Sequence, residues 1–180
     1  KLLAICEHFD DGSVAVRVHP AMVPDAHPLA TVRDSFNAVF VQGEAVGDLM
    51  FYGRGAGGFP TASAVLGDVI DAAGNLRGGG AGRLGQMRRA PIRPIDELRS
   101  PFYLNLRVAD SPGVLAAVAN VFGVHGVSIR SMEQEGLGDD ARLVFITHSA
   151  READLRATLK DLAALDVVLS VGSVLRVIES

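Results

Sequence analysis

Residues 104–123 read LNLRVADSPGVLAAVANVFG, and the organisation of the C-terminal half can be worked out from this stretch. Leu104, Leu106 and Val108 alternate with other residues, which predicts a strand. Pro112 and Gly113 end the alternation and suit the start of a helix. The apolar residues that follow recur at helical spacing, so the stretch predicts a strand, a turn and a helix.

The rest of this half, which we take as 101–180, continues as a succession of predicted strands and a second predicted helix. Strands are predicted over 127–133 and 142–148, a helix capped by Ser149 follows, and 167–178 closes as a strand. The order β-α-β-β-α-β is that of the ferredoxin-like fold, an α+β arrangement of four antiparallel strands with two helices on one face. Because the other face needs a cover, we expect a second copy of the chain to pack there.

The N-terminal half, residues 1–73, reads as strands followed by one helix. Alternation over 13–19 predicts a strand, and 37–43 with 46–52 predict a hairpin. Pro60 suits the first turn of a helix, and Gly74 suits its C-terminal cap. The chain begins directly in the apolar stretch that follows Lys1, so we interpret it as a fragment.

Residues 74–100 differ in composition from both halves. Six glycines lie between Gly74 and Gly85, and six arginines stand against Asp96 and Glu97 alone. Such a stretch buries little apolar surface, which predicts a linker between two folded halves. A basic tail that binds nucleic acid is the alternative, but the stretch lacks the aromatic residues on which bases stack.

The composition of the chain argues against several classes of protein. Its 180 residues are 48% hydrophobic and 21% charged, which is unlike a disordered chain. The single cysteine, Cys6, cannot form an internal disulfide, and this favours a cytoplasmic location. No apolar run reaches the about 20 residues that a membrane span needs. The net charge of −4 does not favour nucleic acid as a partner.

The glycines of Gly53-x-Gly55-x-x-Gly58 follow a predicted strand and open a predicted helix. Backbone amides can approach an anion at such a turn, and a helix N-terminus favours negative charge. A complete dinucleotide-binding fingerprint needs a second strand after the helix, whereas this helix runs into the glycine-rich stretch. Two interpretations stay open: a phosphate-binding loop, or a tight turn that allows close helix packing.

No group of residues forms a self-sufficient catalytic or metal site. The five histidines do not occur at metal-ligand spacing and Cys6 has no partner, so no metal is expected. Lys1 and Lys160 are the only lysines, and Lys160 falls on a predicted helix surface.

The turn at 110–115 is a second candidate site. Amides at the positive end of the helix can hold a carboxylate, Asp110 can meet an ammonium group, and Ser128 can supply a hydroxyl. Together these groups would hold an amino acid. The alternative is an ordinary N-cap in which Asp110 bonds the helix amides.

The C-terminal half resembles an ACT domain from about residue 102 to residue 178. The matching pieces are Asp110-x-Pro112-Gly113-Val114-Leu115 and Gly126-Val127-Ser128-Ile129. ACT domains sense amino acids and bind effectors between copies. The resemblance implies effector contacts from Asp110, Gly113, Val114, Leu115, Ser128 and Ile129. Serine-binding members carry a histidine where this chain has Val108, which argues against serine.

The N-terminal half resembles the end of the catalytic region of bacterial homoserine dehydrogenase. The most specific match is YGRGAGGFPTASAVLGD at 52–68, and shorter ones lie at 1–4, 18–21, 27–30 and 36–39. The resemblance implies that the glycine loop faces a nicotinamide cofactor, NAD or NADP, with Gly57, Gly55 and Ala56 as contacts.

The two resemblances together imply the C-terminal portion of an enzyme that interconverts L-aspartate 4-semialdehyde and L-homoserine, in threonine, methionine and isoleucine synthesis. The family's nucleotide-binding domain and catalytic lysines would precede Lys1, so these residues alone are expected to be inactive. The ACT domain is expected to bind threonine as a feedback inhibitor. The ACT domain and the catalytic segment are both expected to join copies into a homo-oligomer. The alternative is a non-catalytic ACT module that regulates or dimerises.

Overall fold

The computed structural model describes residues 1–80, 87, 89–136, 138 and 140–179. The chain divides into two compact units, one formed by Lys1–Pro24 with Ala90–Ser180 and the other by Asp25–Arg89. Along the described residues, no helix is both long enough and apolar enough to cross a membrane.

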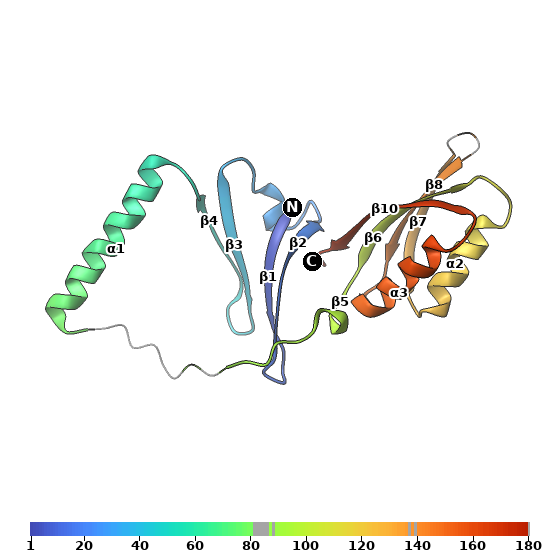
Figure 1. Ribbon diagram of the computed structural model, residues 1–180. Helices are drawn as coiled ribbons and strands as arrows, with labels where there is room; N and C mark the ends of the chain where they lie inside the picture. Colours follow the sequence, from blue (N-terminus) through green and yellow to red (C-terminus); the bar gives the residue numbers. More distant parts are fainter. Residues whose placement is uncertain (81–86, 88, 137, 139, 180) are drawn as a thin grey trace. The chain divides into compact units, whose positions relative to one another are not determined.

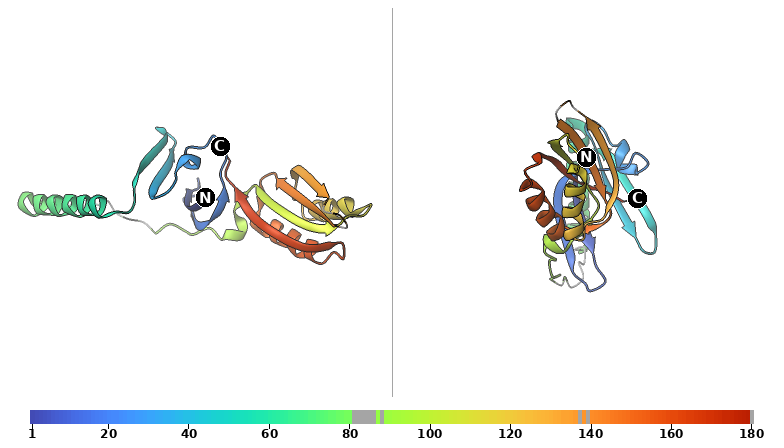
Figure 2. Two further views of the ribbon diagram at one scale, coloured as in Figure 1. Left: turned by 90° about the horizontal axis from the view of Figure 1, so that it is seen from above. Right: turned by 90° about the vertical axis from the view of Figure 1, so that its right-hand side faces the viewer.

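The larger unit contains the predicted β-α-β-β-α-β order (Figure 1). Its strands lie in the order β10-β6-β8-β7, and each neighbouring pair is antiparallel. The helices α2 and α3 lie on one face of this sheet (Figure 2). The predicted ferredoxin-like fold is therefore confirmed for β6 (Phe102–Ala109), α2 (Val114–Val124), β7 (Ile129–Gly136), β8 (Asp140–Thr147), α3 (Glu152–Ala163) and β10 (Val168–Val177).

The alternation that predicted β6 also builds the core beneath the two helices. Every second side chain of this strand, from Phe102 to Val108, is at most 2% exposed. These side chains pack with Phe122 of α2, Phe145 of β8 and Leu162 of α3. Each such burial contributes about 1.5–3 kcal/mol of hydrophobic free energy, so this half carries a complete core of its own.

The first residues of the chain extend this sheet, which the sequence did not predict. The hairpin of β1 (Leu2–His8) and β2 (Val14–Met22) joins it through β2, which pairs with β10 in parallel. Ala21 and Met22 stand opposite Arg176 and Val177. The result is a six-stranded sheet in the order β1-β2-β10-β6-β8-β7. Residues 1–24 therefore share a unit with the C-terminal half, not with 25–73.

The helix α3 begins at Glu152, and its N-cap is Arg151 with no side-chain cap, so the prediction of a cap at Ser149 is wrong. The chain stays extended for two further residues because β9 (Ala150–Arg151) pairs with β5 (Arg99–Ser100). The Glu152 amide also donates to the Leu98 carbonyl at 2.9 Å. Because these backbone hydrogen bonds keep Ala150 and Arg151 extended, the helix begins only at Glu152.

The predicted linker is ordered at both of its ends. At the start, α1 (Gly58–Gly78) runs past Gly74 and ends at Gly79, whose φ of 67° is left-handed. At the other end, η2 (Ile95–Glu97) and β5 lie in the larger unit. Residues 81–86 and 88 lie outside the described residues, as do Leu137 and Asp139 of the predicted turn at 136–140.

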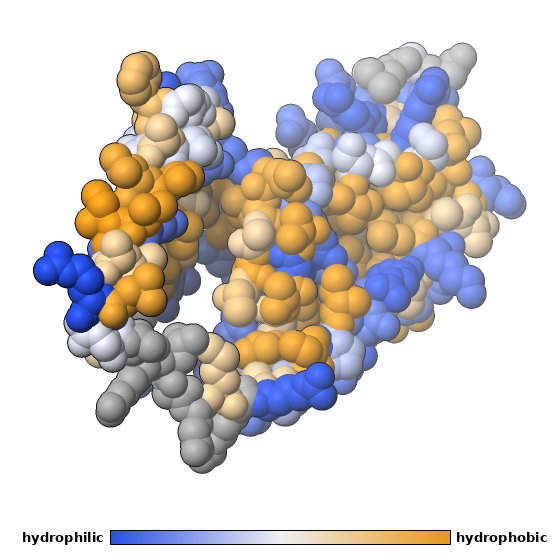
Figure 3. All heavy atoms as spheres, turned by 60° about the vertical axis from the view of Figure 1, so that its left-hand side comes forward, coloured by the Kyte–Doolittle hydropathy of each residue, from blue (hydrophilic) through white to orange (hydrophobic). Residues whose placement is uncertain are grey.

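The smaller unit contains η1 (Pro28–Thr31), the hairpin of β3 (Phe36–Gly43) and β4 (Gly47–Arg54), and α1. The predicted hairpin is confirmed, with Phe36 opposite Arg54 and Gly43 opposite Gly47. Apolar side chains of α1 such as Val65, Leu66 and Ile70 are more than half exposed, and Figure 3 shows apolar side chains gathered on the surface of this helix.

Candidate functional site

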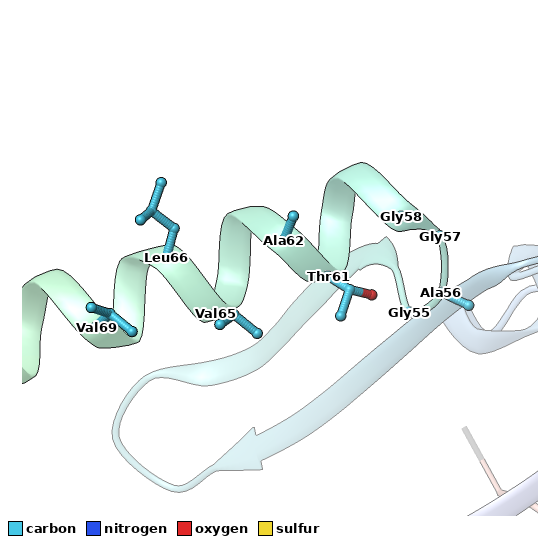
Figure 4. Close-up of a pocket in the computed structure, with 9 residues that line it drawn as sticks. All are labelled: Gly55, Ala56, Gly57, Gly58, Thr61, Ala62, Val65, Leu66 and Val69. Atoms are coloured by element: carbon cyan, nitrogen blue, oxygen red, sulfur yellow. The ribbon is translucent and has the colours of Figure 1, made fainter.

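The glycine loop, residues 55–57, connects β4 to the N-terminus of α1 (Figure 4). Together with Gly58 it forms one end of an open concave surface. The remaining residues that line this surface come from the first turns of α1 and are mostly apolar, namely Thr61, Ala62, Val65, Leu66 and Val69. The structure thus brings the predicted contacts Gly55, Ala56 and Gly57 to one surface.

A side chain would have a different effect at each glycine of this segment. Gly57 has a φ of 130°, a backbone conformation that side chains disfavour. At Gly55 the backbone is ordinary, but an added Cβ would lie 1.5 Å from Nδ2 of Asn37. At Gly58 an added Cβ would meet nothing within 4 Å. Spacing alone could not separate these three cases.

The N-terminus of α1 is suited to an anion. Its N-cap, Gly57, offers no side-chain hydrogen bond, and its first turn carries no acidic residue. The first amides of a helix lack intrahelical acceptors, and the aligned peptide dipoles place partial positive charge there. Within the described residues, no carboxylate of the first turn offsets that charge. The loop therefore fits a negatively charged group such as a phosphate.

His27 is a buried residue of the smaller unit that the sequence did not single out by itself. Its Nδ1 accepts a hydrogen bond from the Leu29 amide at 3.1 Å, so the ring caps η1. The ring also meets Phe40 edge to face at 4.8 Å between centroids.

Among the described side chains, no group of three or more His, Cys, Asp or Glu residues could hold a metal ion.

The second candidate site lies where β6 leads into α2. Gly113 is the N-cap with a left-handed φ of 90°, and no side chain caps the helix. The alternative in which Asp110 caps α2 is therefore not observed. Asp110 is exposed, and its Oδ2 would lie 3.5 Å from a Cβ placed on Gly136. Val114 is buried, whereas Leu115 is 36% exposed.

Two arginines at this end of the sheet form ion pairs with neighbouring carboxylates. Arg107 forms an ion pair with Asp140, and Arg142 forms one with Glu135. The register places Arg107 opposite Arg142, so the two pairs lie side by side. This leaves Asp110 as a carboxylate with a helix N-terminus beside it, an arrangement that suits a zwitterion.

Ser128 and Ile129 lie at the opposite end of the sheet from Asp110. Ile129 pairs with Thr147, and the next pair along β8 joins Ile146 to Tyr103 at the start of β6. Asp110 follows the last residue of β6. At about 3.3 Å per strand residue, the two sites are about 25 Å apart. One chain therefore does not bring Asp110 and Ser128 together.

Two family models match the chain in succession. A homoserine dehydrogenase model matches residues 1–70, and an ACT domain model matches residues 102–167. Homoserine dehydrogenase of Corynebacterium glutamicum is 49% identical over 181 residues, which cover 98% of this chain and 41% of the relative. That of Bacillus subtilis is 37% identical over 182 residues, covering 98% of this chain and 42% of the relative.

A solved structure gives the same result. The homoserine dehydrogenase of Thiobacillus denitrificans superposes with a TM-score of 0.90 at 32% identity, over 99% of this chain and 42% of that one. The chain thus spans about two fifths of the length of the relatives that it matches. Both of its halves align, in order, with the C-terminal part of these enzymes. Over almost its whole length the chain is therefore similar to the C-terminal part of homoserine dehydrogenases, with residues 1–70 matching that family's model and residues 102–167 matching an ACT domain.

Proposed function

We propose that the chain works as the C-terminal part of a homoserine dehydrogenase, which interconverts L-aspartate 4-semialdehyde and L-homoserine with NAD or NADP in the cytoplasm. The observation that carries the proposal is the glycine loop, where Gly57, with a φ of 130°, precedes a helix N-terminus that no side chain caps. The match of residues 1–70 to the family supports it. Acid–base groups would come from residues outside this chain, so the chain alone is expected to show no turnover.

In this proposal the loop contacts the cofactor through backbone. The nicotinamide cofactor, when bound, supplies or accepts the hydride. Gly57 sets the direction in which the chain enters α1, and Gly55 and Ala56 precede it on the same surface. The first amides of α1 donate to the phosphates, and the dipole of this 21-residue helix favours their charge.

Gly57→Ala tests this role in a full-length enzyme that carries these 180 residues as its C-terminal part. The substitution strains a φ of 130° and shifts the loop, so the KM for the cofactor should rise roughly tenfold. Gly67→Ala is the matched control, since Gly67 lies on α1 with nothing within 4 Å of an added Cβ. An unchanged cofactor KM in the Gly57 variant would refute the proposed contact.

For the ACT domain we propose feedback inhibition by threonine, bound between two copies of the chain. Asp110, Gly113, Val114 and Leu115 of one copy would hold the ligand together with Ser128 and Ile129 of the other. The support is geometric, because these two groups lie at opposite ends of the sheet in one chain. This arrangement requires a homo-oligomer that forms through the ACT domain, and we propose that the catalytic segment joins copies as well.

Mixing two variants that each fail to bind threonine tests the shared site. Asp110→Ala and Ser128→Ala should each abolish threonine binding as homo-oligomers. Mixed oligomers of the two variants should recover part of the threonine binding. In a mixed pair of copies, one of the shared sites combines an intact Asp110 with an intact Ser128. Calorimetry that detects no heat with threonine, isoleucine or methionine for the unmodified oligomer would support the alternative, an ACT domain that only joins copies.

A further inference from the structure

The start of β3 forms the support on which the glycine loop rests. Asn37 stands opposite Gly53, and its side chain lies on the same face of the hairpin as Val39 and Val41. Both valines are exposed, at 60% and 42%. Asn37 is exposed as well and is the polar side chain at the end of this apolar row, next to the loop.

Asn37 occupies the space that a side chain at position 55 would need. A Cβ added to Gly55 would lie 1.5 Å from Nδ2 of Asn37 and 2.6 Å from its Cγ. The carboxamide therefore touches the Gly55 backbone directly. Within the described residues the carboxamide forms no hydrogen bond, so the contact with Gly55 is van der Waals packing.

The backbone on either side of this contact is held firmly. The Gly55 amide donates to the Ser35 carbonyl at 3.2 Å. The Arg54 guanidinium lies 4.9 Å from the centre of the Phe36 ring, and that ring stacks on Tyr52 at 4.8 Å. With its neighbours fixed, the position of the loop depends on what fills the space beside Gly55.

We propose that Asn37 is a positioning residue for cofactor binding, which sets the glycine loop by packing its carboxamide against Gly55. The inference rests on the proposed function of the loop. It also assigns the reason for glycine at 55 to Asn37, and not to the close approach of a ligand. A neutral carboxamide fills the space without repelling an anion, whereas a carboxylate of the same shape would repel one.

The packing is tested in the 180-residue chain without cofactor, through the amide chemical shifts of Gly55, Ala56, Gly57 and Gly58. Gly55→Ala should move these shifts because the methyl group collides with Asn37. Asn37→Ala should also move them, and the double variant should return them toward the original positions because the two changes compensate. Additive shifts without compensation, or no shift in Asn37→Ala, would overturn the proposal.

The functional part is tested by the cofactor KM of the full-length enzyme. Asn37→Ala should raise it roughly tenfold through a misplaced loop, with a smaller change in kcat. Asn37→Asp keeps the shape, so it should leave the loop shifts in place but raise the KM further at low ionic strength. An unchanged KM in both variants would refute the positioning role.

The Gly57→Ala variant separates failure of this inference from failure of the proposed function. If Gly57→Ala raises the cofactor KM and the Asn37 variants do not, the loop binds cofactor and the role of Asn37 is wrong. If none of these variants changes the KM, the loop does not face the cofactor, and both proposals fall. Gly67→Ala again serves as the variant with unchanged KM.

Discussion

Arg17 shows how a single charged side chain is held in the β1–β2 hairpin. The Arg17 side chain is only 9% exposed, and its guanidinium donates to both carboxylate oxygens of Glu7, at 2.8 and 3.0 Å. These hydrogen bonds lower the pKa of Glu7 below its ordinary 4.5, against an opposing effect of desolvation. The Ser13 hydroxyl and amide lower the pKa of Asp11 in the same way.

The lowered pKa of Glu7 predicts an acid-sensitive hairpin. The stabilisation is present above pH 4.5 and is lost as the pH falls through the lower pKa of the folded state. Glu7→Gln should therefore flatten the decrease in the free energy of unfolding below that pH. Denaturant titrations at several pH values measure it, with Glu44→Gln as the control. An equal decrease in Glu7→Gln would contradict the prediction.

Two buried threonines of the larger unit predict unequal costs for the same substitution. Both are 0% exposed. Thr147 Oγ1 accepts from the buried Phe102 amide at 3.0 Å, whereas Thr158 Oγ1 donates to the Asp154 carbonyl of its own helix. Thr147→Val leaves an amide without an acceptor and should cost about 1–3 kcal/mol. Thr158→Val should cost clearly less, and equal losses in thermal denaturation would argue against this account.

At the scale of elements, the end of α1 depends on backbone conformation and not on composition. Gly74, the predicted cap, lies inside the helix, and an added Cβ there would meet nothing within 4 Å. Gly79 carries the left-handed φ of 67° that ends the helix. The residues after Gly74 continue the helical pattern, so the prediction that Gly74 ends the helix is wrong.

These two glycines predict opposite effects of the same change. Gly74→Ala removes a flexible residue from a helix interior and should stabilise the helix by about 0.5–1 kcal/mol. Gly79→Ala places a side chain in a left-handed conformation and should destabilise it by about 1 kcal/mol or more. Circular dichroism of the thermal transition measures both. Stabilisation by Gly79→Ala would show that the helix ends elsewhere.

For the whole molecule, the segment that leads into the ACT domain, residues 91–93, also binds the N-terminal hairpin of β1 and β2 and clamps its turn. The Val14 amide donates to the Pro91 carbonyl at 2.9 Å, and the Arg93 amide donates to the Val14 carbonyl at 2.9 Å. The Arg93 guanidinium binds Asp11 at 2.7 Å and lies 3.8 Å from the centre of the Phe9 ring. Residues far apart along the chain thus hold the turn between β1 and β2.

Arg93→Ala should loosen this clamp without harming the ACT core. Hydrogen exchange of the β2 amides should become faster, while that of β6 and β8 should stay unchanged because their core is separate. Arg89→Ala, which removes an exposed arginine before the clamp, is the matched control. Faster exchange across all strands would mean that the hairpin and the ACT core unfold together.

Much of this architecture follows from local patterns in the sequence. Alternation from Leu104 to Val108 and the turn at Pro112 and Gly113 predicted β6 and α2, since side chains two apart in a strand share a face. The glycine loop was also located from its spacing. The contact between Asn37 and Gly55 was not predicted, because the two residues meet only when β3 and β4 pair.

By itself the sequence determined the β-α-β-β-α-β order, the glycine loop and the family resemblance, because each depends on residues close together along the chain. Tertiary structure determined that residues 1–24 extend the ACT sheet through Ala21 and Arg176. It also determined that Asp110 and Ser128 lie at opposite ends of that sheet. Pairing between distant strands depends on backbone hydrogen bonds, which every residue type can accept and every type but proline can donate, so no local pattern encodes it.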